Sequence, residues 1–213
     1  METEEFPPFI NYKKKFTTMP QCTNEIFQNI ESTCSNRTVS GIEQTVYLLN
    51  RDDIQTIEYD ANDYNKVTNI TLKSGKTAFT AKGFKRNMTC GFERNVSDDT
   101  VDTFTDSLTL TGYQFNASGA RNFDNMGNIV AIVDRKGTKQ ADGSVIILGL
   151  ENGLFVSADS WAAGDNNGAR SITLSSMADA GESCSYYVYT VSEGSPAQES
   201  YEATIESLEA MLS

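Results

Sequence analysis

Apolar and polar residues alternate in short segments along most of the chain, and this is the pattern of half-buried β-strands. The segment Val46-Tyr47-Leu48-Leu49 predicts a buried strand. Residues 129–133 and 145–148 are rich in β-branched side chains, and Asp142-Gly143 between them is a strong turn signal. These segments predict a central hairpin.

Further strands are indicated on either side of this hairpin. Residues 67–72 and 77–80 flank the turn residues Ser74-Gly75-Lys76 and predict a second hairpin. Residues 169–175 and 185–191 alternate in the same way and predict two later strands. By contrast, Ile54 and Ile57 are spaced for one helical turn at most.

Two long ribbons, residues 85–94 and 103–115, lack a continuous apolar face. Strands of this kind have a weakly specified register when they stand alone, and they gain from pairing with another chain. We therefore expect a long inter-subunit hairpin here.

Helical periodicity is confined to short stretches. Residues 117–126 predict a short helix, with Ser118 as its cap and Gly127 at its end. Residues 22–33 predict another. The clearest helix begins near Pro196, and its apolar positions recur at helical spacing: Tyr201, Ile205, Leu208 and Leu212.

Together these elements predict a mainly β fold, an antiparallel β-sandwich or barrel with a flanking short helix and a C-terminal helix. We divide the chain into an N-terminal arm with a short helix (1–40), a β domain (41–192) and a C-terminal helix (193–213).

Charge and composition narrow the functional classes. The chain has 213 residues, a formal net charge of −12 and no histidine. Phosphate neutralisation needs clustered Lys and Arg, so the acidity argues against a nucleic-acid-binding groove. The acidity can also be explained by solubility alone. Without histidine, Ser-His-Asp and Cys-His catalysis are excluded, and no phosphate-binding glycine motif occurs. We predict no enzyme, no catalytic or metal-binding residue and no cofactor.

The remaining candidates for chemistry are carboxylates and cysteines. Asp98, Asp99, Asp102 and Asp106 could bind calcium, but their spacing does not match an EF-hand, and a solvated acidic loop is favoured. A carboxylate-dependent glycosidase is a further, less favoured reading. The four cysteines form no CxxC pair, which predicts reduced thiols, with a Cys22–Cys34 bridge as the alternative.

The chain opens without a secretion signal, and no apolar run reaches the ~20 residues of a membrane span. We therefore predict no association with a membrane.

The turn Gly149-Leu150-Glu151-Asn152-Gly153-Leu154, together with the helix and hairpin that precede it, resembles the corresponding region of phage tail-tube-like proteins from Bacteroidetes phages. Residues 41–54 are similar to the opening strand of those proteins, and residues 70–79 to their next hairpin. Residues 165–174 are similar to their closing strand region. The resemblance covers about residues 40–190.

This resemblance implies a structural virion protein, either a tail-tube subunit or a tail-ring subunit, assembled in the host cytoplasm. Such subunits form homo-oligomeric rings, typically sixfold, whose sheets join into an inner barrel. The rings contact adjacent tail proteins and conduct DNA without binding it specifically. The alternative function is a carbohydrate-binding β-sandwich that uses Trp161 and the tyrosines of residues 186–189.

Overall fold

The computed structural model describes residues 38–61, 63, 65–83, 88–112, 117–137, 139–162, 168–178, 184–190 and 200–213. Several predictions lie outside these residues: the arm at 1–20, the helix at 22–33, the Cys22–Cys34 bridge, residues 165–167 and the helix start at Pro196.

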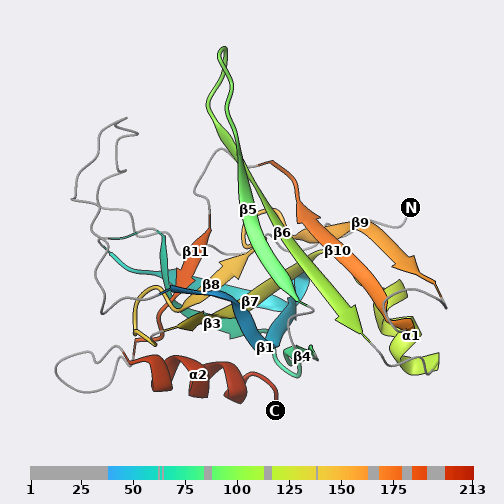
Figure 1. Ribbon diagram of the computed structural model, residues 1–213. Coiled ribbons are helices and arrows are strands. Elements are labelled where there is room, and N and C mark those ends of the chain that lie inside the picture. The colour runs from blue at the N-terminus through green and yellow to red at the C-terminus, as the bar shows by residue number, and fades with distance from the viewer. Residues whose placement is uncertain are drawn as a thin grey trace, which may run out of the picture.

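The described chain is mainly β, as predicted (Figure 1). Its strands are β1 (Thr38–Asn50), β2 (Ile54–Tyr59), β3 (Lys66–Leu72), β4 (Phe79–Lys82), β5 (Thr89–Asn95), β6 (Thr103–Gly112), β7 (Ile129–Gly137), β8 (Val145–Leu148), β9 (Leu154–Trp161), β10 (Arg170–Ser176) and β11 (Ser185–Tyr187). The helices are α1 (Ala117–Asp124) and α2 (Tyr201–Ala210), and a 3-10 turn, η1 (Arg51–Asp53), follows β1.

All eleven strands belong to one sheet, whose main path runs β2-β3-β11-β8-β7-β9-β10-β6-β5. Strand β1 lies beside β7, and β4 lies beside β1. The pairs are antiparallel except for β11 with β3, which makes the sheet mixed. Within the described residues the end strands β2 and β5 do not pair with each other, so the sheet is a folded sandwich and not a closed barrel.

The sheet folds over itself and encloses two cores. The first core lies between β1-β7-β8 and β6-β10, and includes Val46, Leu108, Val133, Leu148, Ile172 and Leu174. The second core lies on the other face of β1-β7-β8 and is covered by α2; it includes Leu49, Ile57, Val67, Ile132, Ile147, Tyr187 and Leu208. Because β7 is buried on both faces, its run of residues 129–133 is apolar without alternation.

The central hairpin is confirmed, since β7 pairs with β8 in register from Ala131↔Leu148 to Asp134↔Val145. The long hairpin is confirmed in its described part: β5 pairs with β6 from Thr89↔Thr109 to Asn95↔Thr103 and projects beyond the rest of the sheet (Figure 1). The predicted short helix is α1, and the predicted C-terminal helix is α2, which begins at Tyr201 after the capping side chain of Ser200.

Two local predictions are wrong. Residues 67–72 and 77–80 do not form a hairpin, because β3 pairs with β2 and β11 while β4 pairs with β1. Ile54 and Ile57 do not form a helical turn; both are buried in strand β2. In each case burial in a core shared with distant strands decides the structure over the local spacing.

Candidate assembly surface

Strands β5, β6, β10 and β9 form one layer of the sandwich, and side chains alternate across it. In β6, Leu108 and Leu110 are buried, and they lie opposite Leu174 and Ile172 of β10, which are also buried. Successive side chains in a strand point to opposite faces. The intervening residues of β5, β6 and β10 therefore point away from the first core.

The outward face of this layer is covered by small polar side chains, and we call it the hydroxyl face. Thr109 and Thr173 lie opposite each other, with their hydroxyl oxygens 3.2 Å apart. The face contains one charged residue, Glu93, and no lysine or arginine. Its members on β5, β6 and β10 are Thr89, Gly91, Glu93, Asn95, Thr103, Thr105, Ser107, Thr109, Thr111, Ser171, Thr173 and Ser175. On β9 the register adds Ala158 and Ser160, and it places the apolar Phe155 at the margin of this face.

Both lateral edges of the layer are open within the described residues. Strand β5 forms a ladder only with β6, and residues 39–42 of β1 lie across a cavity from its residues 89–92. Strand β9 pairs with β10 along its length, but on its other side it meets β7 only at Leu154. In the sequence, Phe155-Val156 indicates the start of a strand, whereas the polar segment from residue 160 favours a loop, so the local pattern does not reveal most of this edge. Trp161 is the strand-forming side chain near the end of β9.

Large apolar side chains are exposed at these two edges. Phe92 on β5 is 51% exposed, and Phe155, Val156 and Trp161 on β9 are 44%, 41% and 56% exposed. Apolar groups clustered on a surface are typical of a site that another molecule covers. Unpaired backbone along the same edges presents ladder donors and acceptors to such a partner.

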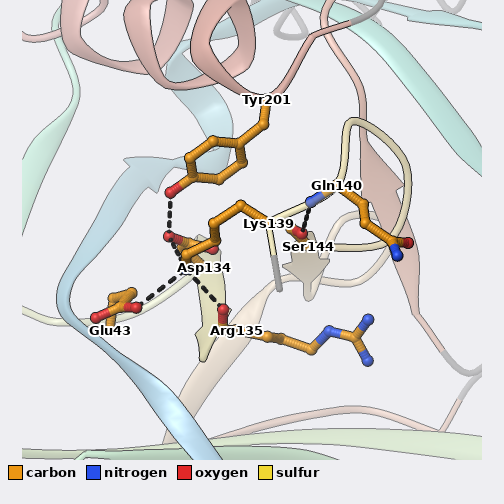
Figure 2. A network of polar contacts seen from close by, with 7 residues as sticks. All are labelled: Glu43, Asp134, Arg135, Lys139, Gln140, Ser144 and Tyr201. Atoms are coloured by element: carbon orange, nitrogen blue, oxygen red, sulfur yellow. Dashed lines mark hydrogen bonds and ion pairs between the residues drawn. The ribbon is translucent and has the colours of Figure 1, made fainter. Parts of the chain in front are cut away.

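The strongest candidate for a chemical site is a polar network around Asp134 (Figure 2). The buried Asp134 carboxylate accepts hydrogen bonds from the Tyr201 hydroxyl at 2.6 Å and the Lys139 ammonium at 2.8 Å. Lys139 also binds Glu43 at 3.0 Å. Burial and then the Asp134 carboxylate raise the pKa of Tyr201 above its usual value. These contacts connect α2 to β7, and the loop after β7 to β1, so the network has a structural role.

A cavity of about 450 Å³ lies near this network, but Arg135, Cys90, Cys184 and Tyr186 are among its lining residues, and Asp134 and Tyr201 are not. Cys90 and Cys184 are not joined by a disulfide, and burial raises the pKa of Cys90 to about 11. A thiol with a raised pKa is a poor nucleophile at neutral pH.

The predicted acidic cluster is not assembled into one site. Asp102 binds Arg94 and accepts the Ser97 amide, and hydrogen bonding from that amide lowers the pKa of Asp102. Asp106 instead accepts the Gly149 amide at 2.8 Å. Asp98 and Asp99 are exposed at the hairpin tip. Among the described residues, no three metal-ligating side chains gather.

The aromatic residues considered for sugar binding are also dispersed. Tyr187 is fully buried and Tyr189 packs beside it against the second core, whereas Tyr186 packs against the first core. Trp161 is exposed at the end of β9 and donates to the Gly168 carbonyl at 3.1 Å. The four side chains do not share one face.

In the part of the chain that the structure describes, no helix is long and apolar enough to cross a membrane. No protein-family model matches the chain, and no curated protein or solved structure matches it.

Proposed function

We propose that this chain is a non-enzymatic structural subunit of a phage tail, which forms rings by pairing the β9 edge of one copy with the β5 edge of the next. The main support for this proposal is that the layer β5-β6-β10-β9 has two open edges and a mostly polar outer face. A ring or tube assembled this way belongs to the virion.

Strand direction supports this pairing. Each neighbouring pair in the layer is antiparallel, so β5 and β9 run in opposite directions. Cyclic symmetry repeats the layer with the same orientation relative to the ring axis. The β9 edge of one copy therefore meets the β5 edge of the next as an antiparallel pair, and the same face of every copy points toward the axis.

The dimensions allow an open conduit. A sixfold ring would join about 24 strands into one barrel, and barrels of 16–18 strands already leave a water-filled channel. With strands about 4.8 Å apart and tilted by about 40°, the barrel backbone would be roughly 50 Å across.

The hydroxyl face suits the inside of such a barrel. It holds Glu93 and no cation, and the chain carries a net charge of −12. DNA sticks to proteins through lysine and arginine contacts to phosphate, so a lining without them lets DNA pass. The core face of the layer would remain inside each subunit.

Val156→Lys tests the lateral contact, because a charged side chain on an edge strand opposes edge-to-edge pairing. Val156 is 41% exposed on β9. We expect the variant to fold, as judged by circular dichroism and thermal unfolding, but to sediment as a monomer at concentrations at which the unmodified protein forms rings.

Met177→Lys is the matched control. Met177 is 69% exposed just beyond the end of β10, and it does not belong to the β9 edge that would pair with the next copy. This variant should form rings like the unmodified protein. Rings that persist in Val156→Lys, or an unmodified chain that stays monomeric at high concentration, would overturn the proposal.

A further inference from the structure

The tip of the β5-β6 hairpin is ordered and exposes two apolar side chains. Val96 and Val101 flank the tip and are 75% and 68% exposed. The tip is held by its own hydrogen bonds: the Asp102 carboxylate accepts the Ser97 amide, and the Ser97 hydroxyl accepts the Thr100 amide, both at 3.1 Å. A surface that is ordered before binding loses less conformational entropy when it docks.

A cavity of about 740 Å³ lies at the other end of the same strand. Gly112, the last residue of β6, lines it, and α1, β4 and the C-terminal Leu212 surround it. Phe79 and Leu212 on its lining are 55% and 38% exposed, although both are large and apolar. The buried Met88 and the half-buried Phe123 complete the apolar wall.

The hairpin cannot reach the cavity of its own copy. The tip precedes Thr103 and the cavity lies at Gly112, so the ten residues of β6 separate them by roughly 30 Å. The two features lie at opposite ends of the molecule (Figure 1). A contact between different surfaces at opposite ends repeats without closing, which is the geometry of a stack.

The charges of the two features are complementary. Asp98 and Asp99 are exposed on the tip between the two valines. Lys82 lines the cavity and is exposed at the end of β4. Opposite charges at the rim of an apolar contact favour one orientation of docking and disfavour others.

We propose that the hairpin tip of one copy docks into this cavity of a second copy in the adjacent ring, with Val96 and Val101 in the apolar wall and Asp98 or Asp99 beside Lys82. The inference rests on the proposed ring function and names the contact that joins one ring to the next. Its occupant is a second copy of this chain.

Charge reversal with rescue tests the docking. Lys82→Glu alone, and Asp98→Lys with Asp99→Lys, should each leave single rings intact and reduce stacked rings about tenfold or more, as counted in negative-stain images. Combining the three substitutions should restore stacking, because the charges again oppose each other. Stacks that persist in both charge-reversed variants would overturn the inference. So would a triple variant that fails to form stacks again.

Val96→Ser with Val101→Ser tests the apolar part, with Met177→Ser as control, since Met177 is 69% exposed just beyond the end of β10. The hairpin variant should form rings that do not stack, and the control should stack. If the unmodified protein formed no rings at all, that result would instead contradict the proposed function. A photo-crosslinker at position 96 should capture peptides that contain Phe79 or Phe123; capture elsewhere in stacked rings would refute the docking site.

Discussion

At the scale of single residues, the turn between β8 and β9 shows why some positions accept only glycine. Gly153 has a φ of +72°, and a Cβ atom there would lie 2.3 Å from the Asn128 Oδ1 atom. The Gly153 amide also donates to the Gly149 carbonyl at 2.8 Å. Conformation and space therefore both restrict this position.

We expect Gly153→Ala to destabilise the protein by more than Gly75→Ala. Gly75 has a similar φ of +75° but open space around it, so alanine there costs about 1–2 kcal/mol from the backbone alone. At Gly153 the clash with Asn128 should add about 1–3 kcal/mol. Urea unfolding of both variants measures the difference, and equal losses would contradict the role of Asn128.

The sequence indicates the turn at residues 149–154 but not its partners. The Arg51 side chain donates to the Leu150 carbonyl at 3.2 Å, and Asp106 accepts the Gly149 amide. These partners lie far away along the chain, so no local pattern predicts them.

At the scale of elements, α2 and β11 meet through a buried hydroxyl pair. The Tyr187 hydroxyl lies 3.0 Å from that of Ser207, and Tyr187 is fully buried. Burial raises the pKa of Tyr187 to about 12, from about 10 in an unfolded chain. The folded state thus favours the protonated hydroxyl, and its contribution is complete below about pH 10 and lost as the pH rises through about 12.

Tyr187→Phe should therefore cost about 1 kcal/mol below pH 10 from the lost hydrogen bond. Between pH 10 and 12 the unmodified protein should lose about 2–3 kcal/mol that the variant keeps, so the stability gap should shrink and then reverse. Urea unfolding from pH 8 to pH 12 measures both curves. Parallel curves over that range would show that Tyr187 titrates as it does in the unfolded chain.

Elements were predicted better than their partners. The helix α2 follows from the spacing of Tyr201, Ile205 and Leu208, which needs only local information. Strand β4 was assigned to the wrong partner because the turn at Ser74-Gly75 is equally compatible with a hairpin and with a longer connection. Pairing of β4 with β1 selects the longer connection, and β1 packs in cores whose residues come from distant parts of the chain.

At the scale of the whole molecule, the assembly surface was predictable only in part. The weakly apolar ribbons predicted the long hairpin, and β5 and β6 confirm it. The open edge of β9 was missed, because an edge is a property of the strand order and not of any one segment. The acidity by itself does not distinguish a DNA-conducting lining from simple solubility, because it does not say where on the surface the charges lie.

In the proposed ring, β9 of one copy pairs with β5 of the next. Electron cryomicroscopy of the concentrated protein would resolve this contact. We predict closed rings in which the sheet is continuous from β9 to the neighbouring β5, with Thr109 and Thr173 facing the axis. Rings in which those edges remain unpaired, or in which the hydroxyl face points outward, would rule out this mode of assembly.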